Sequence, residues 1–264
     1  MKKITEIECF LLDMDGTFYL GEQLIEGARQ FINTLKKQQK QFVFLTNNSS
    51  KNTRDYCNKL ENMGVNVSTD RIVTSGEVTA SYIKNINQQA VIYLVGTKSL
   101  KQDFINNGLK VANNKNEAID FLVVSFDTSL HYQKLWDAHD LILKGVNYIA
   151  TNPDRVCPLA GGKTMPDCGA IIELLKTSTG KKPLVIGKPN TLIIDYVAEK
   201  TGINPGKMAL IGDRLYTDIK TAIKANICSI LVLSGETKKK DLTDFTEQID
   251  FVYNSIKDIY RELG

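Results

Sequence analysis

The sequence of 264 residues lacks several features that mark other classes of protein. No apolar run reaches the roughly 20 residues that a membrane-spanning helix requires, and residues 1–6 lead into only a short apolar segment. We therefore expect no membrane partner and no signal peptide. The net charge is only +3. The densest basic run, residues 238–240, fits a solvated loop, so we expect no nucleic-acid partner either.

Cysteine and histidine are scarce. Five cysteines are scattered along the chain without a C-x-x-C pair, which favours a reduced, cytoplasmic location. The two histidines, His131 and His139, lie eight positions apart on a predicted helix. A metal-binding pair on a helix needs a spacing of about three or four residues. Surface or packing roles therefore fit both histidines best.

What the sequence has instead is a regular alternation of strand-like and helix-like segments. Apolar runs predict strands at residues 9–12, 42–45, 91–95, 121–125, 148–150, 184–186, 208–211 and 227–233. Helical periodicity predicts helices at residues 28–37, 52–63, 100–107, 132–143, 170–176, 191–200 and 216–225. Such alternation is typical of the α/β class with parallel sheets.

Polar residues follow the predicted strands mainly near the two ends of the chain, while the middle has strands and helices of its own. We expect the two ends to build one sheet, with the middle inserted as a second domain. The predicted core comprises residues 1–79 and 181–264. The predicted insertion, residues 80–180, would act as a cap that selects the substrate.

Residues 9–17 are the most informative segment, because an apolar strand pattern ends in Asp13, Asp15 and Gly16. The carboxyl ends of parallel strands are where open α/β sheets bind ligands. Two carboxylates this close repel each other unless a cation or a shared proton offsets them. Oxygen ligands of this kind suit a divalent metal ion. Taken alone, the segment also fits a turn or a helix cap.

Three further predicted strands end in polar residues. These residues are Thr46 and Asn47, Lys188 and Asn190, and Asp213 followed by Asp218. We expect all of these strand ends to lie along one edge of one parallel sheet. The edge would then carry acids, a hydroxyl, amides and an ammonium, which are the groups that phosphoryl transfer needs.

Two roles follow for the first pair of acids. Asp13 is the candidate nucleophile, which would attack phosphorus to give an aspartyl-phosphate. Asp15 would protonate the leaving oxygen and later remove a proton from the hydrolytic water. Backbone N–H groups around Gly16 could cradle the phosphate.

The other strand ends would complete the site. Thr46 and Lys188 would hold phosphoryl oxygens, by a hydroxyl and by charge. Asp213 would bind the metal, and Asp218 would orient Lys188 or metal-bound water. In isolation Thr46 also fits a helix cap and Lys188 a surface lysine, so the functional interpretation depends on all of these segments occurring together.

Four motifs carry a family resemblance: Asp13-Met14-Asp15-Gly16-Thr17, Thr46-Asn47, Lys188, and Gly212-Asp213 with Asp218. On these motifs the chain resembles the haloacid dehalogenase superfamily, and Asp15 is typical of its phosphatases and phosphomutases. Residues 45–49, 187–189 and 212–218 are similar to the nitrophenylphosphatase-like branch, which includes pyridoxal-phosphate and phosphoglycolate phosphatases.

The resemblance implies a Rossmann-like core, a large α/β cap and Mg²⁺. The metal would be bound by the carboxylates of Asp13 and Asp213 and by the backbone carbonyl of Asp15. It also implies phosphate or substrate contacts at Gly16, Thr46, Asn47, Lys188 and Asn190.

In the cap, two segments resemble those that overhang the active site in the family. One is residues 152–154, for which a proline turn with a capping acid is an equal alternative. The other is Asp167, Cys168 and Gly169, which the resemblance places against the leaving group, although a small packing role suits the cysteine better. Which segment dominates substrate selection stays open, as does a homodimer formed through the cap.

The function expected is a Mg²⁺-dependent phosphatase acting on small phosphorylated metabolites such as sugar, nucleotide or aryl phosphates. A phosphomutase and a receiver-like phosphoacceptor that does not turn over are the alternatives. Mutases usually have smaller helical caps, and receivers are about half this length. A nucleotide-binding P-loop at residues 161–164 is disfavoured because Cys157 stands where the pattern needs glycine.

Overall fold

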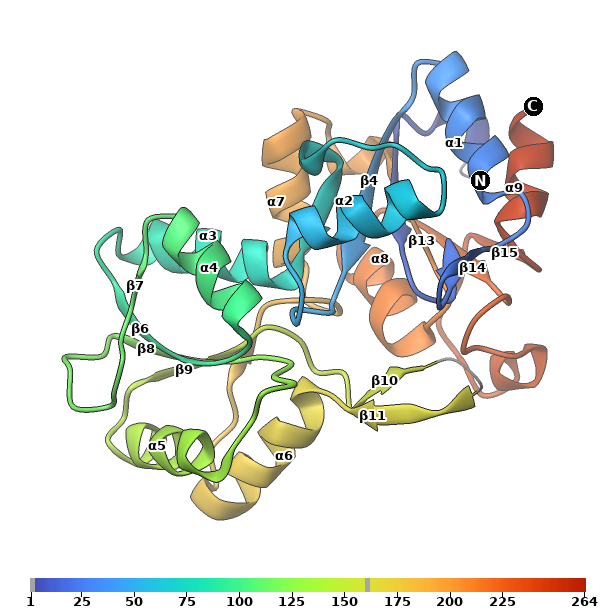
Figure 1. Ribbon diagram of the computed structural model, residues 1–264. Coiled ribbons are helices and arrows are strands. Elements are labelled where there is room, and N and C mark those ends of the chain that lie inside the picture. The colour runs from blue at the N-terminus through green and yellow to red at the C-terminus, as the bar shows by residue number, and fades with distance from the viewer. Residues whose placement is uncertain (1–2, 160–161) are drawn as a thin grey trace. The chain divides into compact units, whose positions relative to one another are not determined.

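The computed structural model describes residues 3–159 and 162–264 (Figure 1). The chain forms two compact units. The first comprises Met1–Thr46, Tyr56–Val73 and Lys188–Gly264, and the second comprises Asn47–Asp55 and Thr74–Gly187. Compared with the expected boundaries, residues 47–55, 74–79 and 181–187 group with the second unit and not with the two chain ends.

The first unit is built on a six-stranded sheet. Its strands are β1 (Cys9–Asp13), β4 (Gln41–Thr46), β5 (Ile72–Thr74), β13 (Met208–Gly212), β14 (Cys228–Val232) and β15 (Phe251–Tyr253), in the order β15-β14-β13-β1-β4-β5. β1 is parallel to both neighbours, with Phe10 opposite Ala209 on β13 and Phe42 on β4. The carboxyl ends of the strands around β1 therefore share one edge, where Asp13 lies opposite Leu45.

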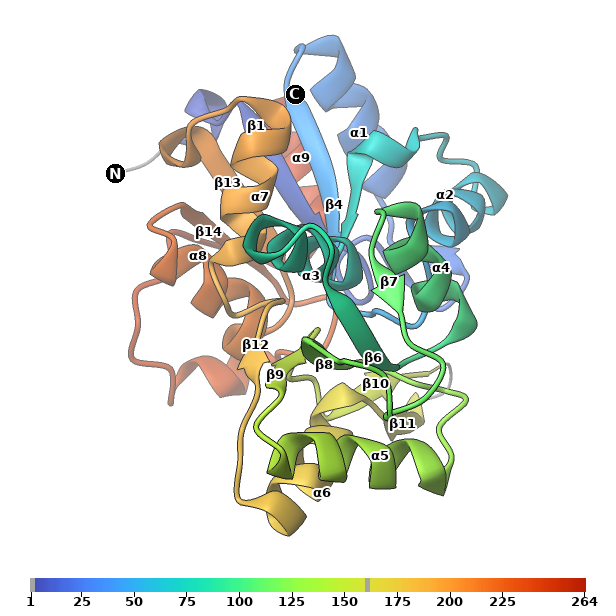
Figure 2. The ribbon, with the colours of Figure 1, turned by 90° about the vertical axis from the view of Figure 1, so that its left-hand side faces the viewer.

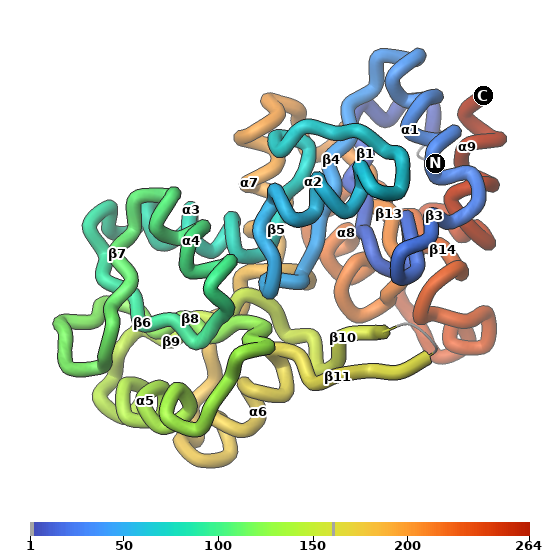
Figure 3. Tube along the Cα trace, in the orientation of Figure 1, coloured from blue at the N-terminus to red at the C-terminus, as the bar shows by residue number. Residues whose placement is uncertain are grey.

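Helices cover both faces of this sheet. They are α1 (Ala28–Lys37), α2 (Thr53–Asn62), α7 (Leu192–Thr201), α8 (Lys220–Lys224) and α9 (Ile256–Leu263). α1 and α9 lie side by side (Figures 1 and 3), and Figure 2 shows α7 and α8 away from them, on the other side of the sheet. A short hairpin, β2 (Tyr19–Leu20) with β3 (Gln23–Leu24), follows β1.

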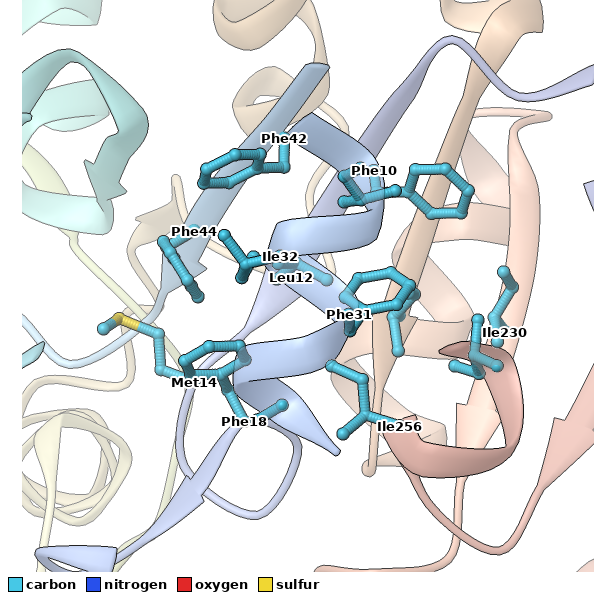
Figure 4. Close-up of a cluster of buried hydrophobic side chains, with 14 of the residues drawn as sticks. Phe10, Leu12, Met14, Phe18, Phe31, Ile32, Phe42, Phe44, Ile230 and Ile256 are labelled. Carbon is cyan, nitrogen blue, oxygen red and sulfur yellow. The ribbon is translucent and has the colours of Figure 1, made fainter. Parts of the chain in front are cut away.

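Large apolar side chains fix β1 in the middle of the first unit. Phe10 and Leu12 point into a cluster with α1, where the rings of Phe10 and Phe31 meet edge to face at 5.6 Å (Figure 4). Leu11, on the opposite face of the strand, is buried as well. A strand that is buried on both faces reads as a continuous apolar run in sequence, which is why its position could be predicted.

The second unit has a five-stranded parallel sheet of its own. Its strands are β6 (Val91–Val95), β7 (Lys110–Val111), β8 (Phe121–Val124), β9 (Asn147–Ala150) and β12 (Leu184–Val185), in the order β12-β9-β8-β6-β7. The helices α3 (Ser75–Ile86) and α4 (Lys98–Asn106) lie on one face of it, and α5 (Tyr132–Leu143) and α6 (Cys168–Thr179) lie on the other (Figures 1 and 2).

A hairpin of β10 (Val156–Pro158) and β11 (Thr164–Pro166) precedes α6. The rejected P-loop falls partly on this hairpin, and its first glycine, Gly161, lies outside the described residues. Within the described part of the chain, we find no helix whose length and hydrophobicity would let it cross a membrane.

The α/β class with parallel sheets is confirmed, but one strand assignment is wrong. The strand predicted at residues 184–186 was expected in the sheet that carries Asp13. In the structure β12 pairs with β9, with Leu184 opposite Ile149, and so belongs to the sheet of the second unit. An apolar run followed by a polar residue does not specify which sheet the strand joins, because the pairing is non-local.

Candidate active site

The first unit brings Asp13, Lys188 and Asp218 into direct contact. Lys188 Nζ lies 2.5 Å from Asp13 Oδ1 and 2.6 Å from Asp218 Oδ1, and only 2% of the lysine side chain is exposed. Asp13 ends β1, and Lys188 begins the last segment of the first unit. A buried ammonium between two carboxylates is held in a fixed position, since charges this poorly solvated need paired partners.

Asp213 joins the same group from the loop after β13. One carboxylate oxygen from each of Asp13, Asp213 and Asp218 lies within 4.8 Å of the other two. The Asp213 carboxylate accepts hydrogen bonds from the Glu236 backbone N–H at 2.6 Å and from the Thr17 hydroxyl at 3.4 Å. Three carboxylates, two of them buried and one partly buried, offer oxygen donors alone and so fit a hard divalent cation.

The electrostatics of this group favour a bound cation. Burial raises the pKa of Asp13 well above its ordinary value, and the carboxylates of Asp218 and Asp213 add to that rise against the opposing effect of Lys188. Burial, followed by the charge of Asp218, raises the pKa of Asp213 to about 7. For Lys188, burial alone would lower the pKa, but the two carboxylates outweigh it and raise that pKa. A divalent cation would offset the excess negative charge.

A π-helical turn sets the position of Asp218. Residues Leu215–Ile219 form this turn ahead of α8, in place of the regular helix expected from residue 216 onward. It leaves Asp218 fully buried, with Oδ2 accepting the Arg214 backbone N–H at 3.1 Å. A Cβ on Gly212 would lie 2.2 Å from the Asp218 side chain, so the glycine is what lets the turn approach the strand end. Single π turns are frequent at functional sites.

Gly16 contributes by its missing side chain. Its φ of +88° lies in the left-handed region, which other residues enter only with strain. A Cβ there would also lie 2.4 Å from Asp213 Oδ2. The N–H of Gly16 donates to the carbonyl of Tyr19 at 2.8 Å, so any phosphate cradle at this turn has to rely on neighbouring N–H groups.

The remaining residues predicted to contact phosphate are distributed over both units. Thr46 is buried at the end of β4 in the first unit, whereas Asn47 groups with the second unit. The Asn47 carbonyl accepts bonds from Ser75 Oγ at 2.7 Å and Asn152 Nδ2 at 2.8 Å. Asn190 Oδ1 accepts the Leu192 N–H at 3.1 Å, at the start of α7.

The two predicted cap segments meet within the second unit. The Gly169 N–H donates to the Asp154 carbonyl at 2.7 Å, and a Cβ on Gly169 would lie 2.3 Å from the Pro153 carbonyl oxygen. Asp167 caps α6, with Oδ1 accepting the Cys168 N–H at 2.5 Å. Cys168 is fully buried, and burial raises the pKa of its thiol to about 12. The packing interpretation of this cysteine therefore fits better than a reactive one.

Sequence reasoning missed the residues that support the acids. Ser234 Oγ donates to the Gly16 carbonyl at 2.8 Å, and a Cβ on Gly235 would lie 1.9 Å from Asp213 Oδ2. The signal was present, because the polar run at residues 234–237 directly follows a predicted strand. Tyr19 also belongs to this supporting group, because its hydroxyl donates to Asp15 Oδ2 at 3.2 Å.

Comparison with known proteins decides the family. The sequence model described as Haloacid dehalogenase-like hydrolase matches residues 10–110, and one described as HAD-hydrolase-like matches residues 185–259. An acid sugar phosphatase of Staphylococcus haemolyticus is 33% identical over 254 residues, covering 96% of this chain and 95% of that protein. The chain belongs to the haloacid dehalogenase-like hydrolases.

Other relatives of this hydrolase point the same way. A 5'-nucleotidase of Bacillus subtilis is 32% identical over 247 residues, which is 94% of this chain and 95% of that protein. The crystal structure of a 4-nitrophenylphosphatase from Thermotoga maritima superposes with a TM-score of 0.94 at 45% identity and covers 99% of both chains. The sequence prediction of a phosphoric monoester hydrolase with this fold is confirmed.

Proposed function

We propose that this hydrolase is a Mg²⁺-dependent phosphatase that cleaves small phosphate monoesters through a phosphorylated Asp13. The convergence of Asp13, Lys188, Asp213 and Asp218 at one edge of the first sheet supports this proposal. Asp13, Asp213 and the backbone carbonyl of Asp15 would hold the metal. When bound, Mg²⁺ would neutralise phosphoryl oxygens and draw the phosphate ester towards the nucleophile.

The protein groups would divide the chemistry between two steps. In the first, a carboxylate oxygen of Asp13 forms a bond to phosphorus while the ester P–O bond breaks, and Asp15 gives its proton to the leaving oxygen. In the second, Asp15 takes a proton from water as the water oxygen attacks phosphorus. The bond from phosphorus to Asp13 then breaks, releasing inorganic phosphate and restoring both acids.

Lys188 has two tasks in this scheme. Burial and neighbouring carboxylates favour the neutral form of Asp13, which is a poor nucleophile. The ammonium at 2.5 Å favours the carboxylate and would also attract a phosphoryl oxygen. Thr46 would add a hydroxyl donor for another oxygen, and Asp218 would keep Lys188 in place from the far side of the ammonium.

For the substrate, we propose small esters of the kinds indicated by the names of the relatives: sugar phosphates, nucleoside monophosphates and aryl phosphates. The second unit would select among them through residues 152–154 and 167–169, the two segments that hydrogen-bond to each other. A screen of phosphorylated metabolites with the purified protein identifies the class. A homodimer through the second unit is a separate prediction, tested by sedimentation.

The proposal is tested with p-nitrophenyl phosphate. The purified protein with Mg²⁺ should release phosphate, and EDTA should stop the release until Mg²⁺ is restored. Asp13→Asn should abolish activity while the circular dichroism spectrum stays unchanged. Turnover by Asp13→Asn at a rate near that of the wild type would exclude Asp13 as the nucleophile. Transfer of the phosphoryl group back to an alcohol in preference to water would instead favour a phosphomutase.

A further inference from the structure

Tyr19 is buried beside the carboxylate that the proposed function uses as acid and base. Its hydroxyl donates to Asp15 Oδ2 at 3.2 Å, and its side chain is fully buried. Backbone hydrogen bonds also hold Tyr19 close to the segment that carries Asp15. The Gly16 N–H donates to the Tyr19 carbonyl, and the Tyr19 N–H donates to the Met14 carbonyl at 3.2 Å. The turn thus fixes the ring relative to Asp15.

The ammonium of Lys59 lies over the face of the Tyr19 ring. Lys59, on α2, places Nζ 4.0 Å from the ring centroid and 3.8 Å from Glu22 Oε1. Only 14% of the Lys59 side chain is exposed, so this cation–π contact is only weakly screened by solvent. A cation over a phenol draws electron density from the ring and makes the hydroxyl a better donor.

The hydroxyl is the one polar atom of the Tyr19 side chain, and the Asp15 carboxylate accepts from it. Packing does not need that hydroxyl, since the ring alone fills its place in the core cluster with Phe18 and Tyr56.

We propose that Tyr19 is a positioning residue for Asp15, and that Lys59 strengthens its hydrogen bond. The hydroxyl holds Oδ2 of Asp15 in one place and so fixes the orientation of the carboxyl group that exchanges a proton with the leaving oxygen and later with water. The inference rests on the proposed function, because it presupposes Asp15 as the acid and base. Its consequence is that Tyr19 matters most where the leaving group needs a proton.

The test compares two aryl esters that differ in leaving group. Phenyl phosphate has the poorer leaving group and depends on the acid, whereas p-nitrophenyl phosphate depends on it less. Tyr19→Phe keeps the ring and removes only the donor. We expect kcat/KM for phenyl phosphate to fall about tenfold, the effect of losing one hydrogen bond to a charged group. For p-nitrophenyl phosphate we expect a fall of less than about threefold.

Three further variants make the outcome decisive. Tyr253→Phe removes another hydroxyl that donates to a carboxylate, Glu262 at 2.6 Å, and should leave both values of kcat/KM unchanged. Lys59→Met should also lower kcat/KM more for phenyl phosphate than for p-nitrophenyl phosphate, but by a smaller factor than Tyr19→Phe. In an Asp15→Asn background, adding Tyr19→Phe should cost nothing more, because the two residues act through one carboxylate.

The failure of the inference is separable from that of the proposed function. Equal losses for both esters in Tyr19→Phe, or a further loss in the double variant, would reduce Tyr19 to a packing residue while Asp15 kept its role. If Asp15→Asn itself showed no dependence on the leaving group, the role of Asp15 and the inference would both be lost.

Discussion

Replacing Lys188 by methionine tests how the structure balances buried charge. The substitution keeps most of the side-chain volume and removes the ammonium that lies 2.5 Å from Asp13 and 2.6 Å from Asp218. The side chains of these acids are only 14% and 1% exposed, so water cannot replace the lost partner. Two carboxylates are then left buried without their shared cation.

The expected cost is large. Removing one partner of a buried ion pair destabilises a protein by about 3–5 kcal/mol, which corresponds to a fall of roughly 10 °C in Tm for a chain of this size. The loss should be greatest at pH 8 in EDTA, where the carboxylates are most nearly ionised. It should shrink towards pH 5, because burial already raises the pKa of Asp13 and raises that of Asp213 to about 7, so protons replace the missing charge.

A matched control is Lys257→Met. Lys257 Nζ also lies 2.5 Å from a carboxylate, that of Glu26, but the glutamate side chain is 76% exposed. Exposed pairs contribute little, so the urea midpoint should hardly move. Urea unfolding of both variants at pH 5 and pH 8, with EDTA throughout, measures the difference. A Lys188→Met protein as stable as the wild type at pH 8 would refute the charge balance described here.

Two further predictions concern other parts of the chain. Gly235→Ala places a Cβ 1.9 Å from Asp213 Oδ2, so the Mg²⁺ concentration for half-maximal activity should rise about 10- to 100-fold. The control is Gly206→Ala, whose Cβ would lie near the Asn204 side chain. The same Mg²⁺ requirement in both variants would contradict the prediction. Burial, with the charges of Glu77 and Asp55, raises the pKa of Asp103 from 3.8 to about 6. Ionisation of Asp103 therefore destabilises the folded protein above that pH, whereas below pH 4 the group is protonated and the folded protein loses no stability. Asp103→Asn should therefore be more stable than the wild type at pH 8, by about 1 kcal/mol after discounting for partial exposure, and equal to it at pH 4. Thermal unfolding of both proteins at the two pH values tests this prediction. A Tm of Asp103→Asn above that of the wild type at pH 4 alone would show that ionised Asp103 does not destabilise the fold.

The acids at the strand ends could be located from sequence because their strands are unambiguous. β1, β4 and β13 are apolar along their length and buried in the first unit, so each apolar run ends where the site begins. Asp13 and Asp213 were placed at strand ends for this reason. The sheet that β12 joins could not be predicted, because β12 pairs with β9 and no local sequence pattern indicates that pairing.

Two helices were missed although their start signals are present. Thr74 caps α3 by accepting the Glu77 N–H at 3.0 Å, and a threonine followed three residues later by glutamate is a recognised helix start. Ser255 likewise accepts the Lys257 N–H ahead of α9. The strands β5 and β15 have only three residues each, and runs this short give too little periodicity to be predicted.

The polar run at residues 234–237 marks a further strand end in the sequence, but the atoms that it contacts could not be predicted from it. The loop at Ser234 and Gly235 reaches Asp213 and Gly16 from more than 20 positions away in the chain, or over 200 in the case of Gly16. The Tyr19 hydroxyl reaches Asp15 only because a turn brings the ring back. Residue type alone does not distinguish such a contact from ordinary core packing.

The proposed mechanism requires that Asp13 carry the phosphoryl group during turnover. Asp15→Asn should slow hydrolysis by roughly 10²–10⁴ and let the intermediate accumulate with p-nitrophenyl phosphate and Mg²⁺. Rapid mixing should then show a burst of nitrophenol equal to the enzyme concentration, and mass spectrometry after acid quenching should find the phosphoryl group on Asp13. Steady release of nitrophenol without a burst, and an unmodified Asp13 peptide, would show that Asp13 is not the nucleophile.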